Sequence, residues 1–523
     1  MKTATRTLCL FLTLLLVVSL MAIPAAAANY GSYAATVKTA IGANDKTNPG
    51  CGMLSDLNGD GTDEMLLLCR KNGAVSLSVY TLSGTAVSAL MTDRQLYTEN
   101  DGTDGEAAIV KHGGKLQLQV TAETSKSAGT GDKGTRTSVT GNSELYALTN
   151  GKLETVSRVE YQYTYVMTTK GDREIESEGF TCTETAGSAS GARTVQQLEK
   201  WFGDLDKQAR LDVLPQDDTN DGLPLKMLLG RLEGRIGDFQ DVPSNEWFSD
   251  SVEWALLHAV TDGTTDTTFS PNTVCTRAHM VTFLWRTHGS PKVAGTPTMP
   301  FTDVPKTEYY YDAVLWAVKL GITDGVTATT FAPDATLTRG QTVTFLWRDA
   351  CHPSAAIAHF ADVPKDEYYA DAVGWAQEIG VTDGMTETTF VPDGSCTRAQ
   401  IVTFISRAVC APGVHAQDVT GLQLDRKPDY STDNTGKEIL FTFVGDVEDF
   451  NVTSVMLTAR DGLKPDKNVH DLGAMADGAS FLLRTDVPDV AANYGVTFTV
   501  GSRTVTWAIT TSGENGSVYL VEL

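Results

Sequence analysis

The apolar positions of this 523-residue chain follow different patterns in different segments. Apolar and polar residues alternate in short runs before about residue 200 and again after about residue 412, and such alternation predicts strands. Between these parts, apolar residues recur three or four positions apart, which predicts amphipathic helices. The predicted strands lie at residues 65–68, 75–81, 116–120 and 161–168, and then at 439–444, 452–458, 481–485, 496–500 and 504–510.

The first 28 residues differ from everything that follows. Lys2 and Arg6 precede an apolar run at residues 8–20, and small residues follow at 25–28. A basic start, a short apolar run and small residues are typical of a secretory signal peptide. No later stretch reaches the roughly 18 unbroken apolar residues that a membrane-spanning helix needs, so we predict an exported chain without a membrane span.

One motif occurs three times in the helical part, opening at Phe239, Phe301 and Phe360. Each copy starts with Phe-x-Asp-Val-Pro, continues at helical spacing, breaks at a glycine and resumes at a Thr-Arg pair. The opening Phe and the Arg are 38 positions apart in every copy, whereas the copies are 62 and 59 positions apart. The variable length therefore falls in the linkers, and the copies represent one helix–loop–helix unit.

The second helix of each copy begins at a threonine suited to capping it. These threonines are Thr276, Thr338 and Thr397, followed three positions later by His279, Gln341 and Gln400. Thr-x-x-Gln forms a capping box, so the last two copies are predicted to satisfy their first backbone N–H groups in this way. Cys275 and Cys396, directly before two of the caps, are interpreted as small apolar packing residues.

An arginine follows each capping threonine, at Arg277, Arg339 and Arg398. The first turn of a helix disfavours a cation, so its recurrence requires a reason. One interpretation is that the guanidinium and free helix N–H groups hold one anion together. The other is an internal ion pair with the acid of the opening motif, which is Asp241, Asp303 or Asp362. The spacing leaves both open.

Together these motifs resemble the S-layer homology domain in three tandem copies. The resemblance covers residues 239–410 and implies a pseudo-threefold helical bundle whose grooves bind a secondary cell wall polymer, often through pyruvylated amino sugars. It also implies that the three arginines contact the polymer and that Trp247, Tyr309 and Tyr368 line the grooves. The family motif ends in Glu, where this chain has His279, Gln341 or Gln400.

Residues 56–64, Asp-Leu-Asn-Gly-Asp-Gly-Thr-Asp-Glu, form an acidic loop before the first predicted strand. Oxygen-bearing side chains at alternate positions and a glycine for the tight turn are what a calcium loop needs. The predicted ligands are Asp56, Asn58, Asp60, Thr62 and Glu64. The alternative is an acidic turn without an ion, because position twelve of the loop is Leu67.

The formal net charge is −24, which argues against nucleic acid as a partner. No zinc motif and no serine or cysteine hydrolase signature occurs, so we predict that the chain is not an enzyme, with the N-terminal part left open. The predicted function is a surface protein anchored to wall polysaccharide that displays its β-domains. The alternatives are a surface enzyme acting on a glycan or peptide, and a structural lattice protein.

The predicted fold class is a multidomain α+β chain. It consists of a signal peptide (1–28), a β-rich domain with the calcium loop (29–200), a helical connector (201–236), three S-layer homology repeats (237–289, 299–351 and 358–411) and an immunoglobulin-like β-sandwich (412–523). For residues 412–523, the strand spacing favours a sandwich, and the lack of cysteine means that this sandwich has no disulfide of the usual kind.

Overall fold

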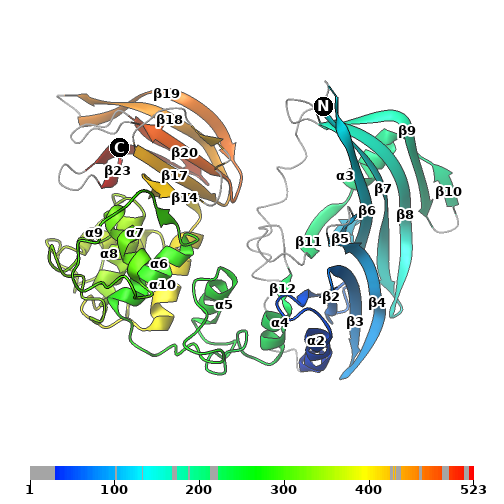
Figure 1. Ribbon diagram of the computed structural model, residues 1–523, viewed down its shortest axis with the longest axis horizontal. Helices are drawn as coiled ribbons and strands as arrows, with labels where there is room; N and C mark the ends of the chain where they lie inside the picture. Colours follow the sequence, from blue (N-terminus) through cyan, green and yellow to red (C-terminus); the bar gives the residue numbers. More distant parts are fainter. Residues whose placement is uncertain are drawn as a thin grey trace. The chain divides into compact units, whose positions relative to one another are not determined.

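The computed structural model describes residues 30–99, 103–131, 134–167, 173–186, 189–211, 222–424, 428, 430–431, 437–458, 462–485, 494–511 and 517–523. The signal peptide predicted at residues 1–28 lies outside them. The chain divides after Asp238 into two compact units, which are described separately (Figure 1). No helix in the described part of the chain is both long and apolar enough to cross a membrane.

The N-terminal unit contains two antiparallel sheets. The first has five strands in the order β12 (Leu223–Pro224), β1 (Gly50–Ser55), β2 (Glu64–Lys71), β3 (Ala74–Ser83) and β4 (Ala86–Thr98). The second has seven strands in the order β10 (Ala189–Ala192), β9 (Arg173–Ala186), β8 (Lys152–Met167), β7 (Gly134–Thr149), β6 (Lys115–Gly131), β5 (Thr103–His112) and β11 (Asp206–Leu211).

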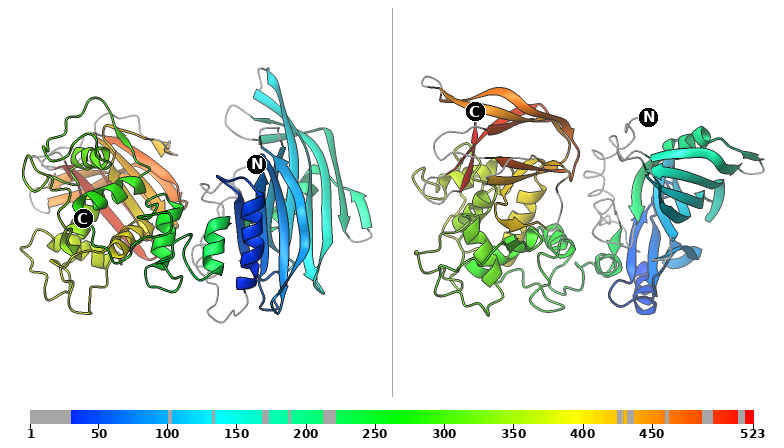
Figure 2. Two further views of the ribbon diagram at one scale, coloured as in Figure 1. Left: turned by 60° about the horizontal axis from the view of Figure 1, so that its bottom comes forward. Right: turned by 45° about the horizontal axis from the view of Figure 1, so that its top comes forward.

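The main core of this unit forms where the two sheets face each other. Leu66 and Leu77 of the first sheet are buried in one cluster with Ile109 and Leu118 of the second. Alternate residues of a strand share a face, so the other face of each sheet needs its own cover. Helices α2 (Gly31–Ala43) and α4 (Leu225–Leu232) pack together beside the five-stranded sheet (Figure 2).

Helix α3 (Val195–Gly203) covers the outer face of the seven-stranded sheet. Its Leu198 is buried against Val159, Tyr161 and Cys182 of that face. The segment predicted to be a helical connector, residues 201–236, also supplies β11 to one sheet and β12 to the other. This segment is therefore part of the N-terminal unit.

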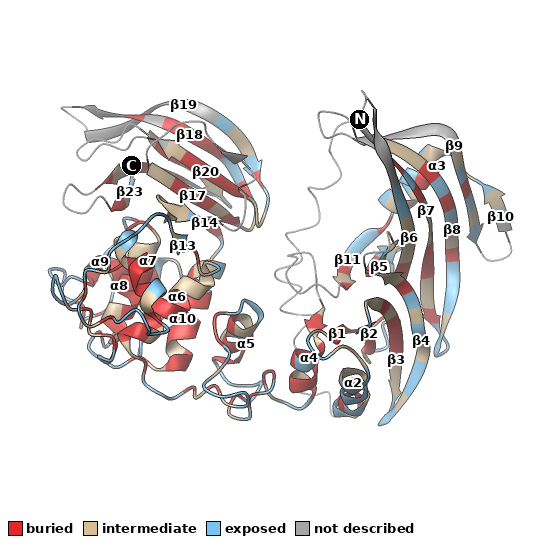
Figure 3. Cartoon of the chain, viewed as in Figure 1, coloured by how far each residue is buried: buried red, intermediate tan, exposed pale blue. Residues whose placement is uncertain are grey.

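The three repeats each contribute two helices. These are α5 (Ser249–Leu257) and α6 (Arg277–Thr287), α7 (Tyr311–Lys319) and α8 (Arg339–Asp349), and α9 (Ala370–Glu378) and α10 (Arg398–Cys410). The second helix of each repeat packs against the first helix of the next, and α10 of the last repeat packs against α5 of the first. Buried residues occur along the helices of all three repeats (Figure 3).

A ring of backbone hydrogen bonds joins the repeats just before their second helices. Cys275 N donates to Cys396 O, Cys396 N to Leu337 O and Leu337 N to Cys275 O, each at 3.0 Å. All three side chains are fully buried, as expected for the apolar packing role predicted for the two cysteines. Because each residue donates to one neighbour and accepts from the other, the ring is complete only when all three repeats are folded.

Residues 413–523 form two further sheets. One has the order β14 (Gly413–Asp418), β17 (Lys437–Val444), β20 (Ser480–Thr485) and β16 (Tyr430–Ser431); the other has β19 (Gly462–Met475), β18 (Val447–Thr458), β21 (Tyr494–Val500), β22 (Arg503–Thr511) and β23 (Val518–Glu522). Phe441 and Phe481 of the first sheet share a core with Phe450 and Phe498 of the second. Aromatic rings of both sheets contact one another in this core.

The linkers between repeats attach the repeats to these C-terminal sheets. In the first linker, β13 (Lys292–Val293) pairs with β15 (Leu422–Gln423). In the second linker, the Cys351 side chain is buried in the core shared by the two sheets. Leu520 N of β23 donates to Cys351 O at 3.0 Å, and Ser354 N donates to Leu520 O at 2.9 Å. Both linkers therefore contact the C-terminal part of the chain.

The structure confirms a multidomain chain with a β-rich N-terminal part and three helical repeats. Several strands were not predicted, because their sequences lack clear alternation. Strand β7, for example, pairs with β6 and β8 along its length, although many of its residues are Ser, Thr, Gly or Asn.

His352, in the second linker, gives this attachment a predicted pH dependence. Its ring stacks on Tyr519 at 4.1 Å and its Nδ1 donates to Val518 O at 3.1 Å. Burial lowers the pKa of His352 to about 4, whereas an unfolded histidine titrates at about 6.5. The unfolded chain binds more protons between these values, so stability from the neutral ring is present above pH 6.5 and lost as the pH falls toward 4.

We therefore expect the free energy of unfolding, measured with urea between pH 7 and pH 4.5, to fall less steeply with acid in His352→Phe than in the natural chain. The exposed His359 provides the matched control, and His359→Phe should keep the natural pH dependence. Identical pH profiles for His352→Phe and the natural chain would contradict the assignment.

Candidate functional site

The start of the second helix is built in the same way in all three repeats. Thr276, Thr338 and Thr397 each accept a hydrogen bond from the backbone N–H three positions later, and the side chain at that position returns one to the threonine N–H. The box predicted for two repeats thus occurs in the first as well. There His279 Nδ1 accepts from Thr276 N at 3.2 Å, so this nitrogen carries no proton.

In the capping box of the first repeat, a histidine stands where the other two repeats have a glutamine. Unlike glutamine, histidine can take up a proton, so this box depends on pH. Burial lowers the pKa of His279, and the charge of Arg398 lowers it further. Both causes favour the neutral ring, which is the form that can accept the Thr276 N–H. The first repeat therefore keeps its capping box at neutral pH.

Each motif arginine is buried in the repeat that follows it. Arg277, Arg339 and Arg398 are 6%, 4% and 5% exposed. Their Nε atoms donate at 2.8 Å to the backbone carbonyl oxygens of Phe331, Phe390 and Phe269, respectively. The last repeat thus binds the first, and the three arginines link the repeats in a closed cycle.

Two phenylalanine rings lie against each guanidinium. For Arg277 the ring centres of Phe331 and Phe345 are 4.8 and 5.3 Å from the central guanidinium carbon. The equivalent pairs are Phe390 and Phe404 for Arg339, and Phe269 and Phe283 for Arg398. Cation–π contacts gain strength when they are shielded from water, so the rings help to offset the desolvation of a buried cation.

The acid of the opening motif supports this contact indirectly. Asp303 accepts hydrogen bonds from Phe331 N at 2.9 Å and Ala332 N at 2.7 Å, and thereby orients the peptide whose carbonyl holds Arg277. Asp241 and Asp362 hold the equivalent peptides. The residue after each phenylalanine has a positive φ, which is 58° even for the β-branched Val391. Such strain persists only where neighbouring contacts impose it.

Two expectations about the arginines are corrected by this geometry. The motif acids do not form ion pairs with them, because each carboxylate is occupied by two backbone N–H groups. The helix N–H groups are not free for an anion either. Arg277 N donates to Ala335 O and Ala278 N to Pro333 O, and the other two repeats have equivalent bonds. The carbonyls of the next repeat take the place that an anion was expected to fill.

The three arginines differ in their remaining hydrogen bonds. Arg277 Nη2 donates to Thr323 Oγ1 at 3.5 Å, and Arg398 Nη2 donates to Thr261 Oγ1 at 3.3 Å. Arg339 Nη2 is buried and has no partner within the described part of the chain. A buried cationic N–H without an acceptor is costly, so this atom is the one best prepared to donate a hydrogen bond to a bound molecule.

The predicted aromatic contacts lie on the surface of the repeats. Trp247, Tyr309 and Tyr368 are 62%, 57% and 60% exposed. Each is braced edge-on by the buried aromatic that follows it, with ring centres 5.0 to 5.2 Å apart. Such bracing fixes the exposed ring and leaves one face open to a ligand.

The structure brings exposed tyrosines close to buried arginines of other repeats. Burial is the main cause of the lowered pKa of Arg277 and Arg398, and the hydroxyls of nearby Tyr368 and Tyr309 oppose it. Tyr309 also lies 6.5 Å from the ring of His279. Sequence reasoning missed the carbonyls and rings of the phenylalanines, although their recurrence in every repeat was a signal that could have identified them.

The acidic loop at residues 56–64 is held by its own side chains. Asp56 accepts from Gly59 N, Asp60 N and Gly61 N, and Asn58 donates to Asp60 Oδ2 at 2.9 Å. Glu64 is fully buried, accepts from Leu57 N and Thr81 Oγ1, and has a pKa raised to about 6 by burial. Within the described residues no group of three His, Cys, Asp or Glu side chains is close enough to share a metal ion. Calcium binding remains a prediction.

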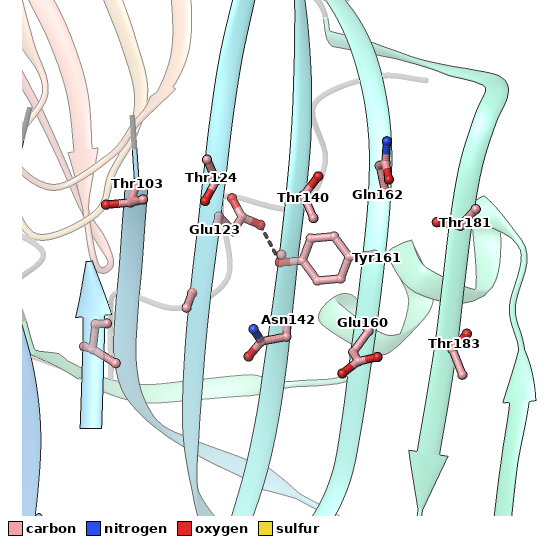
Figure 4. A pocket seen from close by; sticks show the side chains of 13 residues that line it. Thr103, Glu123, Thr124, Thr140, Asn142, Glu160, Tyr161, Gln162, Thr181 and Thr183 are labelled. Atoms are coloured by element: carbon pink, nitrogen blue, oxygen red, sulfur yellow. Dashed lines mark hydrogen bonds between the residues drawn. The ribbon is translucent and has the colours of Figure 1, made fainter. Parts of the chain in front are cut away.

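A polar pocket of about 530 Å³ lies on the seven-stranded sheet (Figure 4). Hydroxyl and carboxamide groups from neighbouring strands line it, including Thr140, Asn142 and Gln162. Asn142 pairs with Glu160, and Gly141 with Tyr161, whose hydroxyl donates to Glu123. Because side chains alternate between faces, Glu160 and Glu123 lie on opposite sides of the sheet. The pocket therefore does not bring these two carboxylates together.

A model of the S-layer homology domain matches residues 238–281, 300–343 and 359–402. The chain thus carries three tandem S-layer homology domains, and the resemblance noted in the sequence is confirmed. One relative is a cell surface protein of Thermoanaerobacter kivui, 31% identical over 118 residues that cover 21% of this chain and 16% of the relative. The protein accordingly belongs to the bacterial cell surface or wall.

Two further relatives correct the expectation that the chain is not an enzyme. They are an amylopullulanase of Thermoanaerobacterium thermosulfurigenes, 25% identical over 174 residues (32% of this chain, 9% of the relative), and an endoglucanase of a Bacillus species, 28% identical over 175 residues (32% and 18%). Both are glycoside hydrolases by name. The similarity lies in the shared repeats, at low identity, and shows no enzyme domain in this chain. The chain spans less than a fifth of the length of these relatives.

The indirect contact between Asp303 and Arg277 can be tested with a double-mutant cycle. We expect Asp303→Ala and Arg277→Met each to destabilise the repeats and to be non-additive by about 0.5–3 kcal/mol, because both act on the Phe331 peptide. The measurement is the free energy of unfolding by urea. Arg484, in the C-terminal sheets, is the control: Asp303→Ala with Arg484→Met should be additive. Additivity of the first pair would show that the peptide does not couple them.

Proposed function

We propose that this protein is anchored non-covalently to a secondary cell wall polymer through its three S-layer homology domains. In this proposal the repeats form a pseudo-threefold helical bundle, the C-terminal sheets form an immunoglobulin-like sandwich, and the N-terminal unit is the displayed part. Residues 1–28 serve as the export signal. The cyclic arginine contacts and the ring at Cys275, Leu337 and Cys396 support the bundle.

The observation that carries this proposal is that every repeat has a buried motif arginine and an exposed, braced aromatic ring, with Tyr368 near Arg277 and Tyr309 near Arg398. Sugar rings present apolar faces that stack on aromatics, and a carboxylated sugar adds an anion for the guanidinium. An arginine fork matches a carboxylate in geometry and charge. An acidic sugar such as a pyruvylated amino sugar supplies both features.

The three junctions do not contribute equally in this proposal. Arg277 and Arg398 donate Nη2 to threonine hydroxyls of the neighbouring repeat, whereas Arg339 Nη2 has no partner among the described residues. A ligand oxygen at Arg339 removes the cost of an unpaired buried donor, whereas at the other two it has to replace an existing bond. The strongest contact is therefore placed at Arg339.

We expect the full chain to sediment with purified cell walls, and the triple substitution Trp247→Ala, Tyr309→Ala and Tyr368→Ala to weaken this binding at least tenfold. These side chains are more than half exposed, so their loss should leave the fold intact, as the melting temperature will show. Ile357→Ala, at a residue 55% exposed in a linker, is the matched control and should bind normally. Undiminished sedimentation of the folded triple variant would refute the role of the aromatics.

A second series separates the three junctions. Lysine keeps the charge of arginine but cannot form the two-pronged contact, so we expect Arg339→Lys to weaken wall binding more than Arg277→Lys or Arg398→Lys. Dissociation constants measured with the isolated wall polymer, alongside melting temperatures, decide the order. Equal losses of affinity in the three variants would mean that the unpaired Nη2 of Arg339 does not make its junction the strongest binding contact.

We also propose that the loop at residues 56–64 binds calcium, because its side-chain oxygens already hold the backbone in a tight turn. A ligand at one hundred times its dissociation constant stabilises the folded state by about 2.7 kcal/mol. Calcium should therefore raise the melting temperature of the N-terminal unit relative to a chelator, and Asp60→Asn should abolish the increase. Glu99→Gln, which lies outside the loop, is the control. Equal melting temperatures with calcium and with chelator would establish an ion-free turn.

A further inference from the structure

A cavity of about 350 Å³ lies at the C-terminal ends of the second helices of the repeats. The last turns of α6, α8 and α10 supply part of its lining, and β14 and β17 supply the opposite side. Its volume falls within the range of small-molecule sites. The motif arginines are in the first turns of the same helices, so this cavity is separate from the proposed wall-binding junctions.

Three histidines line the cavity, and each donates one ring N–H to a protein oxygen. His258 Nδ1 donates to Trp254 O at 2.8 Å, and His415 Nε2 donates to Ala411 O at 2.6 Å. His288 Nε2 donates to the Asp349 carboxylate at 2.9 Å. Since a carbonyl or carboxylate oxygen only accepts, these bonds fix which nitrogen carries the proton.

In the neutral ring of His415 the second nitrogen, Nδ1, is a hydrogen-bond acceptor. No protein group in the described part of the chain bonds to this nitrogen. Burial lowers the pKa of His415, which favours its neutral form. The cavity therefore offers two kinds of acceptor, the His415 nitrogen and the Asp349 carboxylate, and a molecule that binds both has to bring N–H or O–H donors.

The other lining groups narrow the chemistry of that molecule. Trp254 and Trp375 contribute aromatic surface, and Thr442 and Gln417 contribute polar groups. Asp349 accepts from His288 and from Gln417 Nε2 at 3.4 Å, and its side chain is 10% exposed. The carboxylate and the converging C-terminal ends of three helices make the cavity electronegative, which disfavours anions. Here, as elsewhere in the described residues, no three His, Cys, Asp or Glu side chains lie close enough together to hold a metal ion.

We propose that this cavity is a binding site for a neutral, hydroxyl-rich sugar of hexose size. Hydroxyl groups supply the donors for the His415 nitrogen and the Asp349 carboxylate, and can also accept from threonine and glutamine side chains. The tryptophans offer surface for the apolar face of the ring. The electronegative lining favours a neutral sugar in this cavity, whereas an acidic sugar is proposed for the arginine junctions. The chain thereby gains a second carbohydrate site of opposite charge preference, at the end of the repeats that contacts the C-terminal sheets.

The test uses the full chain with glucose, mannose, galactose and N-acetylglucosamine as separate probes, in saturation-transfer NMR and calorimetry. We expect saturable binding of at least one of them, and none of glucuronic acid, whose carboxylate faces that of Asp349. His258→Ala combined with Thr442→Val should weaken binding at least tenfold while melting as the natural chain does. His359→Ala, at an exposed histidine outside the cavity, should bind normally.

If the double variant unfolds, Thr442→Val alone is used, since it preserves shape and removes one polar group. The proposal would be overturned if none of the four neutral sugars bound, if the folded variants bound them equally well, or if glucuronic acid bound more strongly. Stoichiometric binding of Zn²⁺ that the same substitutions abolish would also overturn it. The triple aromatic substitution at residues 247, 309 and 368 should leave neutral-sugar binding unchanged. The cavity variants should still sediment with walls, so the two sites fail independently.

Discussion

A buried cation needs partners, and in this protein the partner of each buried arginine belongs to another repeat. The Nε atoms of Arg277, Arg339 and Arg398 bind carbonyls of the second, third and first repeat in turn. The neighbouring repeat both buries the guanidinium and supplies its acceptor, so the buried arrangement exists only between folded repeats. The same constraint explains the strained peptide after each phenylalanine and the acid that holds it. The three repeats are thus one folding unit with a threefold internal cycle.

The C-terminal sheets extend this unit. The linker residue Cys351 fills part of the core of the sheets, β13 pairs with β15, and Arg503 of β22 forms an ion pair with Glu378 of α9 at 3.0 Å. This part of the chain is therefore joined to the repeats by side-chain and backbone contacts as well as by the covalent chain. The cavity with its three histidines exists only because helix ends and strands meet there.

The sequence was most informative where a pattern was repeated. The capping threonines, the helix spacing and the exposed aromatics could all be placed from three aligned copies, and most predicted strands fall within observed ones. What the sequence could not supply was the identity of partners distant in the chain. Arg398 binds Phe269 across 129 positions, and no local pattern encodes that contact. Strand β7 was missed because pairing on both sides, rather than alternation, makes it a strand.

The ring at Cys275, Leu337 and Cys396 also has a mechanical consequence for a tethered protein. The N-terminal unit is connected to the repeats through the chain just before Phe239, so a pull on that unit enters at the first repeat. That repeat is bonded to the second and to the third. Peeling it away requires both sets of bonds to break together, so shear is shared by all three repeats instead of being taken up one repeat at a time.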